Sequence, residues 1–325
     1  MNAHTTTAAL CLVAAVFSAA PSGANDTPVS HAAGGLVLEA TDAVRMVAED
    51  LHIAAGAVTV TYQFETVSGQ DETLAVAFPL PDIDVGAILH ADPRPARTDS
   101  PNFVGFEVQA DGAPVAPTVV QAAVTPDGRD ITEPLAAMGV PLLPFDGQLL
   151  QLLEGPAPDP DLLARLEEMG ALADGLPTWR VQTSFVWQQL FAGGRTVTVE
   201  HSYRPLAGAF LLYPTQDYRQ DQHAWFRETW CADEGDWLRI VRLAEAAPGA
   251  ELLVRQVDYT LTTGGNWAGP IGRFHLTIEL ASPDDLFTLC WDGLTQVSDT
   301  RFELVAENWI PTGDLSIAFV TADRD

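Results

Sequence analysis

The sequence predicts an all-β fold built mainly from antiparallel strands. The first observation is a repeated alternation of apolar and polar side chains, which is the pattern of strands that bury one face. The second is that Gly, Pro, Asp and Ser residues separate these runs in the manner of turns. Many short strands separated by turns are typical of β-sandwiches, so we expect that architecture.

The clearest strand covers residues 57–66. Apolar side chains occupy alternate positions from Val58 to Phe64, and polar side chains lie between them. The sequence Ser68-Gly69-Gln70-Asp71 is typical of a turn and leads into a second strand at 73–78, so the two strands are predicted to form a hairpin. The same alternation predicts further strands at residues 36–40, 104–110, 115–124, 180–190, 196–203, 208–213, 237–243, 252–262, 273–280, 286–291, 300–306 and 315–320.

The length of 325 residues favours two domains. The break at Tyr213-Pro214-Thr215 is the expected boundary. We therefore predict an N-terminal β-sandwich domain at 25–213 and a C-terminal β domain at 214–325. Both are expected to be sandwich-like and mainly antiparallel.

A helical insertion is predicted in the first domain, at about 131–175. Pro and Gly residues there separate two short Leu-rich stretches, which are the only helices that the pattern predicts with clear signals. Asp159 is a suitable N-cap, Pro160 fits the first helical position, and apolar residues follow at helical spacing. Such an apolar stripe is typical of core packing or of a lid over a sheet edge, and a recruiting or regulatory role is the alternative.

Residues 1–24 have the pattern of a cleavable export signal. An apolar run at 8–20, which includes Cys11, precedes the small residues Ser22-Gly23-Ala24, so cleavage is expected before Asn25. The run lacks a preceding Lys or Arg, and a buried core helix is the alternative. No later run reaches the ~18 apolar residues of a membrane span. The mature chain is therefore expected in the periplasm or outside the cell, with no transmembrane segment.

The net charge of −28 makes nucleic acid and anionic lipid poor partners. All 16 basic residues are Arg, so a Lys nucleophile or Schiff base is excluded. The histidines show no metal-binding spacing, and no cofactor motif is present, so we expect neither a metal nor a cofactor.

Cys231 and Cys290 are the two cysteines that remain after the predicted signal. In an oxidising compartment two such cysteines are expected to pair as a disulfide that closes the second domain. A redox pair is the alternative, but catalytic thiols usually lie close together as Cys-x-x-Cys.

A Gly-rich loop around Trp267 is the best predicted ligand site. Its glycines allow close approach of a ligand to the backbone, and the indole offers a flat apolar face for a sugar ring or a peptide side chain. The alternative is a hairpin turn whose Trp folds back on the sheet. The predicted ligand-binding residues are Gly264, Gly265, Asn266, Trp267 and Gly269.

Carboxylates near Trp230 suggest a second possibility, hydrolysis of cell-wall glycan or peptide with Trp267 as a platform. The residues concerned are Glu228, Asp233, Glu234 and Asp236. The alternative is a compact aromatic core with a solvated acidic rim. No Gly-x-Ser-x-Gly elbow is present, so catalytic residues cannot be assigned from the sequence.

Several motifs are similar to those of the bacterial domain-of-unknown-function 4424 family, and together they span nearly the whole mature chain. They occur at Ala33 to Leu38, Met46 to Ile53, Val58 to Phe64, Ala77 to Asp82, Phe185 to Gln189 and Tyr259 to Phe274. The Phe-Pro pair that usually follows the Trp-Gln stretch is absent from Leu190 to Gly193. The resemblance implies a fold and an exported location, and no chemistry.

Because no catalytic signature is present, the expected function is non-enzymatic. We expect an envelope module that binds or scaffolds a protein, peptide or glycan, with sheet edges available for β-strand addition. The alternatives are the cell-wall hydrolase and a purely structural subunit.

Overall fold

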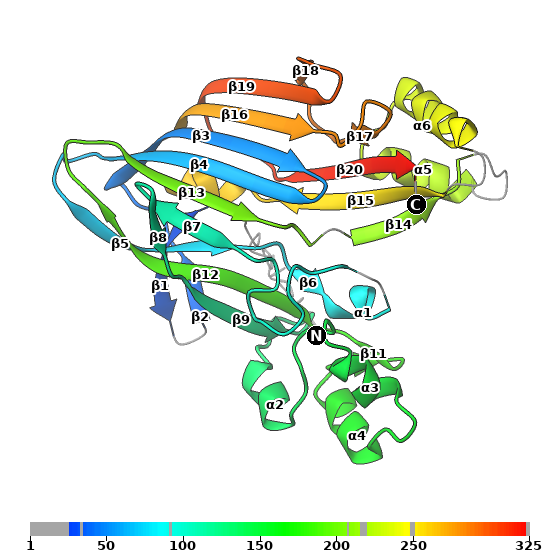
Figure 1. Cartoon of the computed structure of the whole chain (residues 1–325). Coiled ribbons are helices and arrows are strands. Elements are labelled where there is room, and N and C mark those ends of the chain that lie inside the picture. The colour runs from blue at the N-terminus through cyan, green and yellow to red at the C-terminus, as the bar shows by residue number, and fades with distance from the viewer. Residues whose placement is uncertain are drawn as a thin grey trace, which may run out of the picture.

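The computed structural model describes residues 26–32, 35–90, 93–206, 208–214, 220–247 and 251–322. The predicted export signal at 1–24 lies outside these residues. Strands dominate the chain, and β-sheets stack in layers with helices at their margins (Figure 1). The prediction of an all-β, mainly antiparallel chain is therefore confirmed.

The upper layer in Figure 1 is an eight-stranded sheet. Its strands in spatial order are β18 (Thr295–Gln296), β19 (Arg301–Trp309), β16 (Ile271–Glu279), β3 (Val44–Ala54), β4 (Ala57–Thr66), β13 (Val197–Tyr203), β7 (Glu107–Ala110) and β8 (Ala113–Val115). Strand β16 joins β3 in parallel, whereas the other strand pairs that the structure describes are antiparallel.

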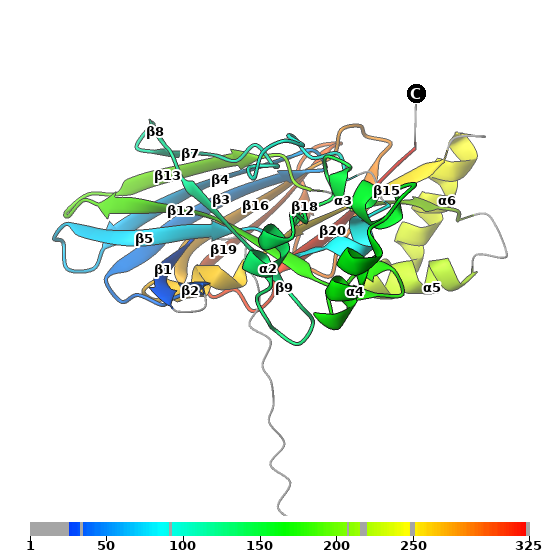
Figure 2. The ribbon, with the colours of Figure 1, turned by 90° about the horizontal axis from the view of Figure 1, so that it is seen from below.

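Two further sheets lie against this layer, as Figures 1 and 2 show from two directions. The six-stranded sheet contains β2 (Gly35–Leu38), β1 (Thr27–Ala32), β5 (Glu72–Pro79), β12 (Arg180–Phe191), β6 (Ile83–Asp84) and β9 (Thr118–Val124), which pairs with β12. The four-stranded sheet contains β14 (Gly208–Leu212), β15 (Leu252–Tyr259), β20 (Leu315–Ala322) and β17 (Leu286–Thr288).

One large hydrophobic core joins the three sheets. Apolar positions of every sheet contribute to it, because alternate residues of each strand turn to the same side. Its largest side chains include Phe64, Phe78, Tyr259, Phe274 and Phe319.

The predicted domain boundary at 213 and 214 separates strands of a single sheet. Strands β16, β18 and β19 come from the C-terminal side, and β16 pairs with β3 from Arg273↔Ala48 to Glu279↔Ala54. The division into two domains stays a prediction, since hydrogen bonding across one sheet does not measure whether each part folds alone.

The predicted hairpin of 57–66 with 73–78 is wrong. Strand β4 pairs with β3 and β13, whereas β5 pairs with β1 and β12 in the other layer. The turn at Ser68-Gly69-Gln70-Asp71 therefore carries the chain from one sheet to the other. Alternation marked the buried faces of both strands, but it did not identify their partners.

Three helices occupy the predicted insertion: α2 (Thr132–Ala137), α3 (Gln148–Glu154) and α4 (Pro160–Glu168). A short ladder of β10 (Leu172–Ala173) with β11 (Leu176–Pro177) follows them. The expected N-cap is confirmed, because the Asp159 side chain accepts hydrogen bonds from the backbone N–H groups of Asp161 and Leu162. The helices pack together over α1 (Val85–Ile88) and one end of β9 and β12.

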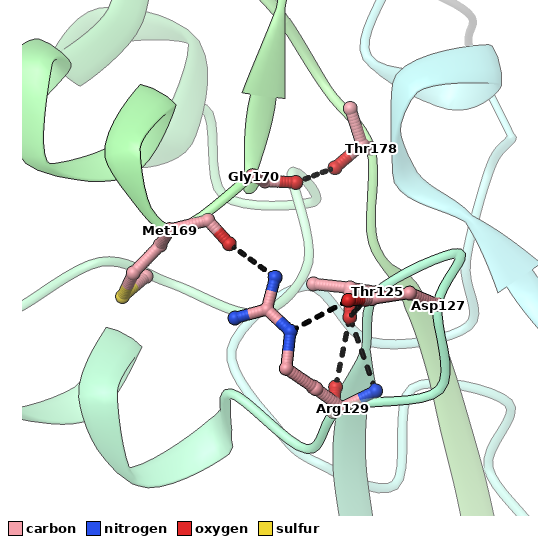
Figure 3. Close-up of polar contacts among 6 residues, drawn as sticks. All are labelled: Thr125, Asp127, Arg129, Met169, Gly170 and Thr178. Atoms are coloured by element: carbon pink, nitrogen blue, oxygen red, sulfur yellow. Dashed lines mark hydrogen bonds and ion pairs between the residues drawn. The ribbon is translucent and has the colours of Figure 1, made fainter.

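Arg129 connects this insertion to the chain that follows β9 through polar contacts, as Figure 3 shows. Its guanidinium group donates to the carbonyl oxygen of Met169 at the end of α4 (2.7 Å) and to the carboxylate of Asp127 (2.8 Å). The Thr178 hydroxyl donates to the carbonyl oxygen of Gly170 (2.6 Å). The two ends of the insertion are thus held next to each other.

Helices α5 (Gln220–Thr229) and α6 (Glu234–Ala246) correct a second prediction, a strand at 237–243. The backbone N–H of Asp236 donates to the Asp233 side chain, and the backbone N–H of Asp233 donates to the Asp236 side chain. This capping box favours a helix start over a strand. The buried residues Trp237, Ile240 and Leu243 then recur at helical spacing and pack on the four-stranded sheet.

The predicted disulfide between Cys231 and Cys290 is confirmed, with Cα atoms 5.0 Å apart. It ties the end of α5 to the chain that follows β17, and both cysteines are exposed. Within the described part of the chain, no helix is both long enough and apolar enough to cross a bilayer.

Reducing this disulfide is predicted to lower the free energy of unfolding by about 4 kcal/mol, because the sequence separation of 59 residues closes a long loop in the unfolded chain. Guanidinium unfolding with and without reductant measures the loss. The double variant Cys231→Ala with Cys290→Ala serves as a control and should match the reduced protein. Equal stability of the oxidised and reduced proteins would contradict the prediction.

Candidate functional site

The Gly-rich loop predicted as a ligand site contacts its own chain. Residues Thr262–Asn266 form a short 3₁₀ helix, and Trp267 after it is only 3% exposed. The indole N–H donates to the backbone carbonyl of Asp26 (2.8 Å), and the Asn266 side chain donates to the Thr27 hydroxyl (2.8 Å). The loop therefore binds Asp26 and Thr27 at the edge of the core.

The Trp267 ring packs inside the core. Its centroid lies 4.5 Å from that of Phe64 and 5.7 Å from that of Phe191. Gly264 is buried as well, and Gly265 and Gly269 are exposed. The exposed part of the loop thus consists of backbone without an accessible aromatic face, and ligand binding there stays a prediction.

Three of the four carboxylates considered for hydrolysis take part in helix capping or an ion pair. Asp233 and Asp236 form the capping box of α6, and Glu234 pairs with Arg227 of α5 (2.9 Å). Glu228 is exposed on α5. Trp230 packs between α5, α6 and the four-stranded sheet, whereas Trp267 belongs to the core of the three sheets. The structure therefore does not bring these carboxylates and the two indoles into one site.

Metal ligands do not converge in the described ranges. No group of three or more His, Cys, Asp or Glu side chains there is placed to hold a metal ion.

A cavity with a mostly apolar wall lies where the three sheets meet. Its volume is about 280 Å³. The chain between β5 and β6, the loop before β7, the end of β13 and the strands β14 and β15 line it. Apolar walls come from Leu80, Ile83, Ile88, Phe103, Val104 and Leu206. We call it the junction cavity.

Two polar atoms at the junction cavity have no hydrogen-bond partner among the described residues. One is Oδ1 of Asp82, and the other is the hydroxyl of Tyr203; both atoms are buried. The other carboxylate oxygen of Asp82 accepts a hydrogen bond from Gln182 (3.3 Å), which fixes the carboxylate in place. Burial raises the pKa of Tyr203, so its hydroxyl stays neutral.

The neighbouring polar groups already have partners. Asp84 caps α1 by accepting from the backbone N–H of Ala87 (3.0 Å). Gln256 donates to both carboxylate oxygens of Asp258 (3.0 and 2.9 Å). The junction cavity therefore has three carboxylates in its wall, of which Asp82 alone has a buried oxygen without a partner.

Local sequence explains how Asp82 reaches this position. Pro79 and Pro81 lack N–H groups and restrict the backbone, so the chain leaves β5 in an extended form. The backbone N–H of Leu80 between them donates to the carbonyl of Thr183 (2.8 Å). The segment Ala77 to Asp82 is one of the motifs that resemble the family, but its residue pattern contains no signal of a ligand site.

A smaller cavity of about 180 Å³ adjoins the junction cavity, and the two share Pro93, Pro205 and Ala209 in their walls. Its remaining walls are basic and apolar: Arg94, Arg204, Arg255, Leu253 and Ala55. We call it the arginine cavity.

A separate polar cluster is enclosed in the core. His201 Nε2 lies 3.5 Å from a carboxylate oxygen of Asp26, and both side chains are at most 1% exposed. Nearby, the hydroxyl groups of Tyr62 and Tyr259 form a hydrogen bond of 2.9 Å. Desolvation lowers the pKa of His201 to about 3, whereas desolvation and the nearby Glu49 raise the pKa of Asp26. His201 is therefore neutral in the folded protein at neutral pH, and the neutral form of Asp26 is favoured relative to an exposed carboxyl group.

The sequence model of the family described as domain of unknown function (DUF4424) matches residues 24–318. No curated protein matches the chain.

Two solved structures illustrate the more distant similarities. A Legionella pneumophila protein described as a presumed nutrient-binding protein shares 15% identity at a TM-score of 0.44, with 92% of this chain and 70% of that chain covered. An M1 zinc metallopeptidase of Deinococcus radiodurans shares 8% identity at a TM-score of 0.28, with 86% and 43% covered. At these TM-scores neither similarity bears on function.

Replacing Trp267 by Ala is predicted to lower the free energy of unfolding by about 3 to 5 kcal/mol, because the change empties a core site and removes the hydrogen bond to Asp26. Denaturant unfolding measures the loss. Trp225→Ala is the matched control, since Trp225 is 47% exposed and its loss should be smaller. Similar losses in the two variants would contradict the buried placement.

Replacing His201 by Phe is predicted to stabilise the protein relative to wild type as the pH falls from 7 to 5. The unfolded wild-type chain gains a proton on His201 below its ordinary pKa of 6.5, and the folded chain does not until about pH 3. The difference should grow by at most about 1.4 kcal/mol per pH unit. Unfolding at several pH values measures it.

A Phe ring fits the aromatic surroundings of His201, which include Tyr62, Phe78 and Trp187. Asp26 is present in both proteins, so His201 is the ionisable side chain that differs between them. A difference that shrinks as the pH falls would instead indicate a charged pair of His201 with Asp26.

Proposed function

The chain belongs to the DUF4424 family, and we propose that this member is an exported binding module whose ligand site is the junction cavity. The proposed ligand is a small molecule or short peptide with an apolar body and a cationic nitrogen. Binding is favoured over hydrolysis because the carboxylates near Trp230 are used for helix capping and ion pairing.

The observation that carries the proposal is the pair of unpartnered polar atoms, Asp82 Oδ1 and the Tyr203 hydroxyl. A buried polar atom without a hydrogen bond costs about 1 to 3 kcal/mol, and more when the group is charged. A ligand that donates to the Asp82 oxygen would recover that free energy. The Tyr203 hydroxyl can donate or accept, so it can adapt to the same ligand.

The wall of the cavity supports the chemical class of the ligand. Apolar side chains form most of it, and a ligand body that buries them gains free energy from the hydrophobic effect. The three acidic side chains favour a positively charged group and disfavour an anion at this end. A volume of about 280 Å³ limits the ligand to a small one.

The proposed exported location is supported by the disulfide between Cys231 and Cys290, since disulfides persist in oxidising compartments. The predicted signal at 1–24 agrees with it. Of the partners expected from the sequence, a peptide fits the junction cavity better than a folded protein or a long glycan.

Titration calorimetry with leucyl-leucinamide, which has an ammonium group and apolar side chains, tests the proposal. We expect saturable binding that Asp82→Asn weakens by about tenfold or more, since a charged hydrogen bond is lost. Tyr203→Phe should weaken binding less and should stabilise the free protein, because a buried unpartnered hydroxyl is removed.

Asp299→Asn, an exposed acid outside the cavity, is the matched control and should bind as wild type. Absence of binding to wild type, or equal binding by Asp82→Asn, would overturn the proposal.

A further inference from the structure

The arginine cavity concentrates positive charge in an acidic protein. The chain has 44 acidic and 16 basic residues, yet three arginines line this one cavity. Several other arginines pair with carboxylates, as Arg45 does with Glu65 (2.6 Å) and Arg195 with Asp111 (2.7 Å).

Within the described part of the chain, neither Arg204 nor Arg255 has a carboxylate within ion-pair distance. Both arginines line one small cavity, and an anion bound there would reduce the repulsion between their like charges. Guanidinium groups also match the planar, two-oxygen geometry of a carboxylate. The arrangement therefore suits a carboxylate ligand.

The backbone holds both arginines at the boundary with the junction cavity. Arg204 directly follows β13, and its backbone N–H donates to the carbonyl of Val104 (3.0 Å). Arg255 lies opposite Ala209 in the ladder of β15 with β14, and the short Ala209 side chain leaves room beside it. Both Val104 and Ala209 also line the junction cavity.

Strand β15 places opposite charges on opposite faces. Successive side chains of a strand alternate, so Gln256 and Asp258 point to one face and Arg255 to the other. The first two line the junction cavity, and Arg255 lines the arginine cavity. The two cavities share Pro205 and Ala209 in their walls, so the acidic and basic groups line adjoining cavities.

We propose that the two cavities together bind a short peptide with free termini. Its ammonium terminus lies at Asp82 in the junction cavity, and its terminal carboxylate lies between Arg204 and Arg255. A single amino acid carries both charges on one carbon, so it cannot place them in two cavities. This inference rests on the proposed function and adds the second charged group of the ligand.

Titration calorimetry at low ionic strength tests it with leucyl-leucine and trileucine, each compared with its C-terminal amide. Of the two peptides, we expect the one that binds more tightly to have at least about tenfold higher affinity than its own amide. The reason is that only the free acid offers a carboxylate to the arginines. Arg255→Gln should remove this advantage and leave binding of the amide unchanged. Arg204→Gln should act in the same direction.

Arg165→Gln on α4 is the matched control, because Arg165 lies outside both cavities and its loss should change neither affinity. Thermal unfolding of each variant confirms that it is folded.

The outcomes separate this inference from the proposed function. Binding of the amides that depends on Asp82 but shows no preference for the free acids would overturn the inference and leave the proposed function standing. Absence of binding by all peptides and amides would overturn both. Equal preference for the free acids in wild type and Arg255→Gln would place the carboxylate elsewhere and overturn the inference.

Discussion

The parallel pairing of β3 with β16 is the constraint on which the rest of the structure depends. It joins strands from the two halves of the chain in one eight-stranded sheet. Because β15 directly precedes β16, the four-stranded sheet is then placed against the same core, where Tyr259 of β15 meets Tyr62 of β4. Residues of β15 and of the chain between β5 and β6 then line the junction cavity together.

Buried polar groups occur in two settings with different consequences. In the core, Asp26 and His201 are fully enclosed, so desolvation raises the pKa of Asp26 and lowers that of His201, and the cluster affects the stability of the fold. At the junction cavity, Asp82 and Tyr203 each have a buried atom without a hydrogen-bond partner, and these are the atoms that the proposed ligand would contact. The free energy lost by leaving them without partners in the free protein is what a complementary ligand would recover.

The loop predicted as a ligand site shows that residue type alone does not reveal which contacts a side chain makes. Gly residues and a Trp in one loop are equally compatible with ligand binding and with close packing. In the structure Trp267 and Asn266 hold Asp26 and Thr27 of the same chain. The strand predicted at 237–243 is wrong, because an apolar run that starts with Trp237 also fits a buried helix face. The capping pair Asp233 and Asp236 was the signal that distinguished the two.

The sequence by itself determined the strand-rich fold, the buried face of most strands, the N-cap at Asp159 and the pairing of Cys231 with Cys290. These features depend on local periodicity, local capping chemistry and a small number of cysteines. Only the tertiary structure decided that β4 and β5 lie in different sheets, that Trp267 is buried, and that Asp82 and Arg255 line adjoining cavities. The physical reason is that alternation identifies which side chains share a face, whereas the partner of that face is set by contacts between segments far apart in the chain.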